Sequence, residues 1–358
     1  VNTVGDFQKM GQRGYCTTHL SFGDQKDCRG WLVGEPHQGL KYMFLMMNGA
    51  RIAVGRGAAA IAMAAYRASL AYAKERPQGR RLTGSGKKDV SKDQTLIINH
   101  PDVRRMLLTQ KVISEGALSL VLLSAKYQDL SLTHEEASER KKYQYLLELL
   151  TPVAKTYPAE KGLEAVSNGL QVLGGYGFCS DFILQQYYRD IRIFSIYEGT
   201  TGIQSMDLLG RKITMDNGAA LTLLAEEMGK TIKMALAEET LKPHAEALAG
   251  KSELMKKVLK HLMEYAQKGN YDRFLADATV FMDFFGNILI GWLWLDMALH
   301  AQKAISEGQT SHQKGFYSGK IHAMQFYFTY ELPKTEGLAR VLLNASDLTV
   351  SVEEGLFE

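Results

Sequence analysis

The stretch from residue 171 to residue 211 reads QVLGGYGFCSDFILQQYYRDIRIFSIYEGTTGIQSMDLLGR. A glycine-rich turn begins at Gly174 and ends one helical pattern, and a break centred on Glu198 precedes another. Glycines let backbone approach a ligand closely, and a helix N-terminus offers free N–H groups to a phosphate or carbonyl oxygen. A carboxylate held just before such a break is suited to act as a base. We therefore interpret this stretch as the chemical centre of the chain.

Helical patterns precede this stretch and continue to its end. Apolar residues at helical spacing predict helices over residues 40–76, 101–130, 135–156 and 158–173, and a further helix that starts after Thr200 or Thr201. We expect Pro152 to kink or split the third pattern, with Pro158 opening the fourth. Together these segments predict an up-and-down helical bundle, so the fold class is mainly α.

Residues 213–358 are expected to form a helical extension of the bundle. The patterns predict helices over residues 219–249, 252–268, 272–306 and 319–343. Aromatic side chains such as Phe281 and Trp294 are expected in the core or at a subunit interface. The most apolar run, residues 280–299, is interrupted by Asp283 and Asp296, which favours a buried helix over a membrane span.

Residues 1–38 differ from the rest of the chain. The segments HLSFGD and GWLVGE are short and apolar and are separated by Gly, Asp and Pro, which predicts strands and turns. So little sheet does not stand alone. We therefore interpret residues 1–38 as the remnant of a β domain, 39–212 as the helical bundle and 213–358 as its extension.

The composition indicates a soluble globular protein in a reducing compartment. Hydrophobic residues make up 46% of the chain, and 42 Lys and Arg against 39 Asp and Glu argue against a nucleic-acid partner. Three cysteines suggest neither a disulfide framework nor a zinc site, and no metal is expected. With no leader-like N-terminus, the expected location is the cytoplasm.

The sequence leaves the roles of two residues, Arg51 and Glu198, open. Arg51 lies in a predicted helix rich in glycine and alanine, and it is either paired within the protein or turned toward a ligand. Glu198 is either a base or an ordinary carboxylate that ends a loop with a cap.

The motifs together resemble the acyl-CoA dehydrogenase family. They are MNGAR (47–51), AKERPQ (73–78), QVLGGYG (171–177), YRD (188–190) and IYEGT (196–200). The resemblance implies the C-terminal portion of that fold, FAD between a β domain and the bundle, and α,β-dehydrogenation of an acyl-CoA to its 2-enoyl-CoA. It also implies a homo-oligomer, a dimer or tetramer, with an electron-transfer flavoprotein as acceptor.

The same resemblance assigns roles to individual residues. Glu198 would be the base that removes the α-proton. The remaining assignments are Gln171, Gly174 and Gly175, with Arg76 and Gln78 from another protomer, for the pyrophosphate and adenosine side of FAD; Thr200 and Gly202 for the flavin; and Asn48 and Arg51 for the acyl-CoA site. Gly79 departs from the aromatic residue that most members carry near this position.

The chemistry of a thioester supports the assignment of Glu198. Its α-proton is weakly acidic, so a base and a means of stabilising the enolate are both needed. An apolar pocket beside Ile196 and Tyr197 would raise the pKa of Glu198 toward the working pH, whereas the following helix would favour the anion. The backbone N–H of Glu198 is suited to donate to the thioester carbonyl.

The helical extension resembles a larger subgroup of the family. That subgroup includes enzymes acting on thioether-containing acyl-CoA such as 3-methylmercaptopropionyl-CoA. Since the N-terminal helical domain and most of the β domain have no counterpart here, we expect the chain alone to lack activity. The alternative is a non-catalytic helical module for oligomerisation, partner binding or nucleic-acid binding.

Overall fold

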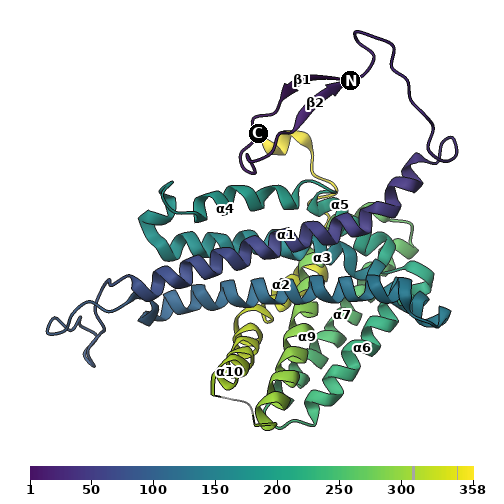
Figure 1. Ribbon diagram of the computed structural model, residues 1–358. Coiled ribbons are helices and arrows are strands. Elements are labelled where there is room, and N and C mark those ends of the chain that lie inside the picture. Colours follow the sequence, from purple (N-terminus) through teal and green to yellow (C-terminus); the bar gives the residue numbers. More distant parts are fainter. Residues whose placement is uncertain (309–310, 345) are drawn as a thin grey trace.

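The computed structural model describes residues 1–308, 311–344 and 346–358. Within these ranges helices predominate, and the strands belong to one small sheet near the N-terminus (Figure 1). The prediction of a mainly α fold is confirmed.

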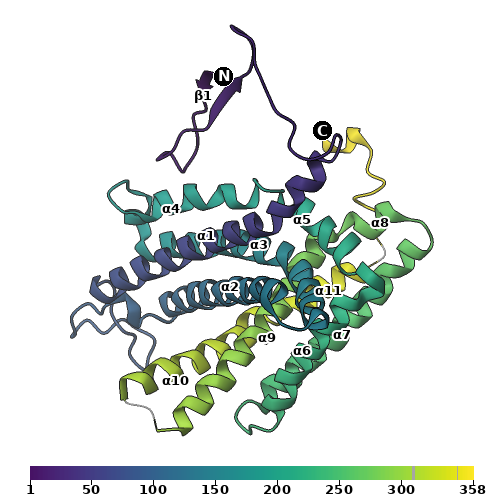
Figure 2. The same ribbon diagram turned by 45° about the vertical axis from the view of Figure 1, so that its right-hand side comes forward.

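Three long helices form the centre of the molecule. They are α1 (Gly39–Glu75), α2 (Pro101–Thr133) and α3 (Ala137–Leu173), which lie side by side in up-and-down order. A short helix, α4 (Leu184–Ile191), covers one face of this layer, and the later helices cover the opposite face (Figure 1, Figure 2). The predicted bundle is therefore present, and both of its faces are covered by other parts of the chain.

Helix α3 corrects the prediction that a separate helix opens at Pro158, and it is not split at Pro152. Pro152 and Pro158 both lie inside one continuous helix instead of dividing it. Pro158 has no N–H for the carbonyl of Ala154, four residues earlier. That carbonyl faces α1 at Gly55, where an added Cβ would lie only 1.9 Å from its oxygen. Close packing of α1 therefore stabilises a helix that local sequence rules interrupt.

The extension consists of six helices among the described residues. They are α6 (Ala219–Leu236), α7 (Lys242–Gln267), α8 (Tyr271–Ala276), α9 (Ala278–Ser306), α10 (Ser311–Phe326) and α11 (Lys334–Leu342). The single helix predicted over residues 219–249 is wrong, because the chain turns between α6 and α7. Leu241 is fully buried at this turn, and Pro243 occupies the first turn of α7, where proline favours a helix start.

Helix α9 is the central helix of the extension (Figure 2). Phe281, Phe284 and Trp294 are all fully buried, as predicted for core aromatics, and the Trp294 indole donates to the Val112 carbonyl of α2 at 3.1 Å. Among the described helices, α2 and α9 are long and apolar enough to cross a membrane. However, 61% and 83% of their most apolar windows are buried inside the fold, which is the behaviour of core helices.

The small sheet pairs β1 (Asn2–Asp6) with β2 (Thr18–Ser21) in antiparallel register. Strand β2 lies where the HLSFGD segment predicts it, whereas β1 was not predicted. The strand predicted in GWLVGE is wrong: the segment forms no strand, and Trp31 is 84% exposed. A strand needs a pairing partner, and no described segment supplies one there.

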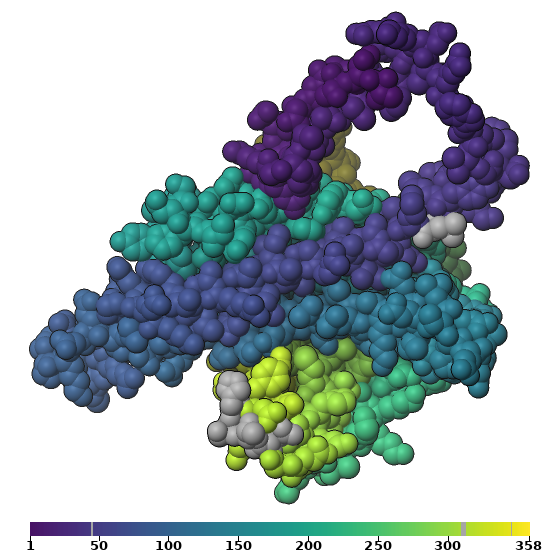
Figure 3. All heavy atoms as spheres, in the orientation of Figure 1, coloured from purple at the N-terminus to yellow at the C-terminus, as the bar shows by residue number. Residues whose placement is uncertain are grey.

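The N-terminal segment is attached to the bundle through α4. The Gln12 backbone N–H donates to the Asp190 carboxylate at 2.5 Å, and the Arg189 guanidinium donates to the Met10 carbonyl at 3.3 Å. Figure 3 shows this segment, coloured purple, above the helices and then arching away from them before α1 begins. The YRD motif is thus an anchor for the sheet in this chain.

One hydrophobic cluster joins the bundle to the extension. It includes Ile52 of α1, Leu120 of α2, Leu150 of α3 and Phe285 of α9, all buried. The extension therefore completes the core of the bundle. The division of the chain into three domains stays a prediction.

Candidate active site

Glu198 lies in a short loop with unusual backbone geometry. The loop connects a 3-10 turn (Arg192–Ser195) to α5 (Thr201–Asp207). Glu198 has a φ of 55° and Gly199 a φ of 89°, so two consecutive residues adopt left-handed backbone. For a residue with a side chain this conformation costs free energy and persists only where surrounding contacts hold it.

Three side chains hold this loop in place. The Lys155 ammonium on α3 donates to the Gly199 carbonyl at 2.8 Å, and the Gln204 amide on α5 donates to the Glu198 carbonyl at 3.1 Å. The Thr201 hydroxyl donates to the Glu160 carboxylate on α3. The loop is therefore fixed by α3 and by the helix that follows it.

Lys155 is the unusual member of this set. Its side chain is fully buried, and burial lowers its pKa to about 8, with the positive charge of Arg51 acting in the same direction. The carboxylates of Glu160 and Glu198 oppose this shift. The lysine thus places a buried donor directly beneath the Glu198 loop.

The surroundings of Glu198 differ from the apolar pocket that the sequence predicts. Glu198 is exposed, and the neighbouring Ile196 is 46% exposed. Tyr197 is partly buried against Phe194, and burial raises its pKa. The described residues of this chain therefore leave one side of the carboxylate open.

The start of α5 shows which residue caps this helix, and the choice between a base and an ordinary carboxylate at Glu198 stays open. The N-cap is Thr200, whose hydroxyl accepts from the Ile203 backbone N–H at 3.5 Å. Glu198 is thus not the cap of this helix. An added Cβ at Gly202 would meet no atom within 4 Å, so the first turn of α5 presents open surface.

Arg51 is paired within the protein. Its guanidinium lies 3.1 Å from the Asp207 carboxylate at the end of α5, and both side chains are buried. Asn48 donates to the Glu148 carboxylate of α3 at 3.0 Å. Both residues therefore make structural contacts in this chain, and their predicted roles toward acyl-CoA stay predictions.

The residues predicted for the adenosine side of FAD lie together at the far end of the bundle. They are Arg76 and Gln78 after α1 and Gln171, Gly174 and Gly175 at the end of α3, and all five are exposed. The Arg76 guanidinium lies 5.4 Å from the Tyr176 ring centre, so the two groups meet within one chain. Added Cβ atoms at Gly174 and Gly175 would meet nothing within 4 Å, which leaves the surface open to a ligand.

A long distance separates this group from the Glu198 loop. Lys155 contacts the loop near the middle of α3, whereas Gly174 caps the C-terminal end of the same helix. At 1.5 Å per residue these positions lie about 28 Å apart along the helix. The two predicted groups therefore form separate surfaces of one chain.

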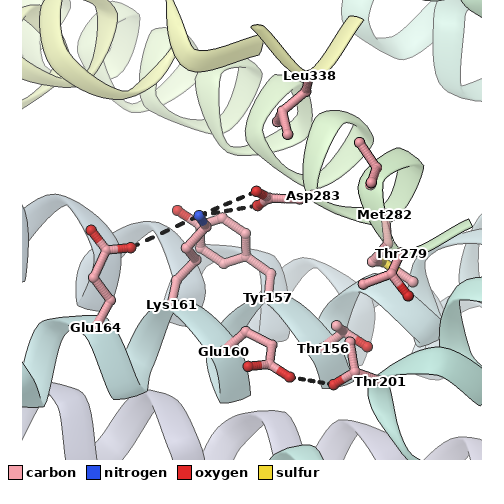
Figure 4. Close-up of a pocket in the computed structure, with 11 residues that line it drawn as sticks. Thr156, Tyr157, Glu160, Lys161, Glu164, Thr201, Thr279, Met282, Asp283 and Leu338 are labelled. Carbon is pink, nitrogen blue, oxygen red and sulfur yellow. Dashed lines mark hydrogen bonds and ion pairs between the residues drawn. The ribbon is translucent and has the colours of Figure 1, made fainter. Parts of the chain in front are cut away.

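A cavity of about 490 Å³ lies between α3, α9 and α11, with Thr201 at the start of α5 on its wall (Figure 4). Lys161 of α3 forms an ion pair with Asp283 of α9 at 3.1 Å inside it. The hydroxyl of Thr156 on the same wall has no hydrogen-bond partner among the described residues. None of the predicted site residues lines this cavity.

Sequence reasoning missed the residues that support the loop. Lys155 and Glu160 lie in a helix whose surrounding positions are mostly apolar. A lysine within such an apolar run could have indicated a buried charge with a specific partner. Gln204 carried no signal of its own. In the described ranges no three His, Cys, Asp or Glu residues are grouped as metal ligands would be, and the three cysteines are free.

Two family models match the chain in succession. Residues 37–213 match the acyl-CoA dehydrogenase C-terminal domain, and residues 224–353 match the acetyl-CoA dehydrogenase C-terminal-like family. These matches cover the helical bundle that carries the Glu198 loop and the extension packed against it. The chain belongs to the acyl-CoA dehydrogenase family, as the motifs predict.

Curated relatives agree with this assignment. The chain is 36% identical over 311 residues to 3-methylmercaptopropionyl-CoA dehydrogenase of Ruegeria pomeroyi, covering 86% of this chain and 51% of the relative. It is 32% identical over 356 residues to the broad-specificity linear acyl-CoA dehydrogenase of Mycobacterium tuberculosis. This match covers 98% of this chain and 58% of the relative. The chain thus spans about half the length of these relatives.

Solved structures show the same fold. An acyl-CoA dehydrogenase from Bacillus anthracis, complexed with FAD, superposes with a TM-score of 0.73 at 21% identity, covering 99% of this chain and 58% of that one. ACDH-11 of Caenorhabditis elegans in complex with C11-CoA gives a TM-score of 0.69 at 19% identity, covering 96% and 54%. The likeness in fold therefore covers the extension as well as the bundle.

Proposed function

We propose that the complete protein is an FAD-dependent acyl-CoA dehydrogenase with Glu198 as the base. The observation that carries this proposal is the Glu198 loop: a carboxylate on left-handed backbone, held by contacts from Lys155 and Gln204, in a chain of this family. The two relatives named above act on different acyl groups according to their names. The acyl chain of the substrate is therefore left open.

The proposed chemistry assigns one task to each part of the loop. The Glu198 carboxylate removes the α-proton of the thioester, and the Glu198 backbone N–H donates to the thioester oxygen as negative charge develops there. Bound FAD would supply the acceptor for the hydride that leaves Cβ. Exposure of Glu198 in this chain fits a site whose other wall comes from the rest of the protein. That wall would exclude water from the carboxylate and the thioester.

The surfaces of this chain suit FAD in two places. Thr200 and Gly202 would contact the flavin beside Glu198. Gln171, Gly174, Gly175, Arg76 and Gln78 would contact the pyrophosphate and adenosine at the far end of the bundle. Open backbone at the glycines and an exposed arginine are the features that a pyrophosphate requires.

The separation of these surfaces supports our proposal of a homo-oligomer, a dimer or a tetramer. Since they lie about 28 Å apart along α3, we infer that one FAD contacts the Glu198 loop of one protomer and the glycine turn of its partner. The resemblance implied that Arg76 and Gln78 come from another protomer than the glycine turn. Arg76 instead lies beside Tyr176 of the same chain, so both would come from the same partner. An electron-transfer flavoprotein is the proposed acceptor, and one relative is named as a subunit of an Etf complex. The proposed location is the cytoplasm.

The decisive experiment replaces Glu198 in the complete protein. Glu198→Gln should retain bound flavin but lose turnover by about 100- to 10,000-fold, because the amide cannot accept the proton. Bleaching of flavin absorbance by an acyl-CoA panel measures the reaction. Glu164→Gln, which alters a partly exposed carboxylate on α3 that pairs with Lys161 at 3.8 Å, is the matched control. Turnover by Glu198→Gln at the wild-type rate would refute the assignment.

For the 358-residue chain alone we propose no turnover. Its two-stranded sheet is too small to cover a flavin ring. The purified chain should show no flavin absorbance after gel filtration with added FAD. Retained flavin with acyl-CoA-dependent reduction would contradict this expectation.

A further inference from the structure

We propose that Lys155 is a positioning residue for Glu198 and that it acts by holding the Gly199 carbonyl. The inference rests on the proposed function of Glu198 as base. Lys155 approaches the loop from α3, beneath the exposed face on which the carboxylate lies.

The absence of an ion pair distinguishes Lys155 from the other deeply buried cations. Arg51 pairs with Asp207, Lys212 with Glu148 and Arg273 with Asp277. Across the described ranges Lys155 forms no such pair, although its side chain is fully buried, and its hydrogen bond goes to the Gly199 carbonyl. A buried ammonium without a carboxylate is costly. We therefore infer that the hydrogen bond from Lys155 to the Gly199 carbonyl has a function that an apolar side chain could not perform.

The Gly199 carbonyl belongs to the peptide that joins Gly199 to Thr200, which is the second peptide after the Glu198 α-carbon. Holding it fixes the orientation of the peptide plane, and with it the ψ of Gly199 and the geometry of the turn into α5. The Gln204 amide holds the preceding carbonyl, that of Glu198, in the same way. Two successive carbonyls are thus restrained, so the Glu198 side chain and backbone N–H leave the loop in fixed directions.

The loop has few other restraints on its exposed side. Ile196, Glu198 and Thr200 are all exposed. The left-handed φ of Glu198 also disfavours the observed conformation when contacts are removed. Loss of the Lys155 donor should therefore let the loop relax, and a displacement of about 1 Å at a reacting group can lower a rate about 100-fold.

The test compares three variants of the complete protein. Lys155→Met keeps the length of the side chain without a donor, and Lys155→Gln keeps an N–H donor without the charge. Lys161→Met is the matched control, because Lys161 lies on the same helix but pairs with Asp283 and makes no contact with the loop. Steady-state kinetics with acyl-CoA gives kcat and KM, and hydrogen exchange of the peptide 196–204 reports the loop without substrate.

The expected result is a selective effect on the chemical step. Lys155→Met should lower kcat about 100-fold with KM nearly unchanged and accelerate exchange in residues 196–204. Lys155→Gln should lie between Lys155→Met and wild type in both measurements, and Lys161→Met should match wild type. A folded Lys155→Met protein with wild-type kcat and wild-type loop exchange overturns the proposal.

The two measurements separate this proposal from the proposed function. If the wild-type protein reduces no flavin with any acyl-CoA, the proposed function fails, while hydrogen exchange still tests the hold of Lys155 on the loop. A second outcome is that wild type is active and that Lys155→Met has a lower kcat and a higher KM without a change in loop exchange. The positioning role is then wrong, and Lys155 has a general structural role.

Discussion

Lys155 makes the stability of the protein depend on pH in a defined direction. Its pKa is about 8 in the folded protein and 10.5 as a free side chain. Between these values the unfolded chain binds more protons, so the free energy of unfolding rises as the pH increases from about 8 to 10.5. Below pH 8 the buried charge costs about 3 kcal/mol.

We therefore expect Lys155→Met to be at least as stable as wild type at pH 7. The difference between the two unfolding free energies should shrink as the pH rises from 8 to 10, because wild type then loses its buried charge. Urea unfolding at several pH values measures this difference. Parallel curves for the two proteins would show that Lys155 is not the titrating group.

Gly55 tests the contact that compensates for Pro158. An added Cβ would lie 1.9 Å from the Ala154 carbonyl oxygen, which belongs to backbone and cannot move aside easily. Gly55→Ala should therefore destabilise the protein by about 1–3 kcal/mol or more. Thermal unfolding measures the change.

The control for this substitution lies on the same helix. At Gly49 the nearest atom to an added Cβ is 3.9 Å away, on the Gln128 side chain. Gly49→Ala should be neutral or stabilising by about 0.5–1 kcal/mol, since alanine favours helix. Equal effects at the two positions would mean that helix propensity, and not packing against α3, decides the result.

At the scale of single elements, α8 depends on its N-cap. The Asn270 side chain accepts from the Arg273 backbone N–H at 3.1 Å, and Arg273 in turn donates to the Asn344 carbonyl near the C-terminal segment. Asn270→Ala should lower the free energy of unfolding by about 1 kcal/mol. Asn270→Asp retains an acceptor and should stay close to wild type in the same denaturant titration. An alanine variant as stable as the aspartate variant would contradict the capping role.

Element boundaries were predicted well where the signal is local. Pro101 in the first turn of α2, the glycine turn after α3 and the start of α5 at Thr201 all lie where the sequence places them. The continuous course of α3 through two prolines was not predictable in the same way. It depends on packing against Gly55, which is about one hundred residues away in sequence.

At the scale of the whole molecule, the extension supplies part of the core. Trp294 of α9 donates to the backbone of α2, and Lys320 of α10 pairs with Glu115 of α2 at 2.9 Å. A fragment ending at Lys212 would expose the apolar surface that α9 covers. We expect this fragment to aggregate or to bind a hydrophobic dye, without a cooperative thermal transition. A soluble fragment with a sharp transition would show that the bundle folds independently.

The candidate site was predictable to the extent that its residues are adjacent in sequence. Glu198, Gly199 and Thr200 form one motif, so the loop and the helix after it could be recognised together. The pairing of Arg51 with Asp207 and the hold of Lys155 on Gly199 join distant segments. No local pattern distinguishes such a partner from any other polar residue in a helix.

The sequence by itself determined the mainly α fold, the family and the loop that carries Glu198. Helical periodicity, glycine turns and short motifs are local properties of the sequence. They can be recognised without knowing which residues are neighbours in space. Only the tertiary structure decided that Glu198 is open on one side, that Arg51 is paired and that a buried lysine supports the loop. The burial of a side chain and its hydrogen-bond partners depend on which segments of the chain are in contact. Desolvation and hydrogen bonding act between neighbouring atoms in space, whatever the separation of their residues along the sequence.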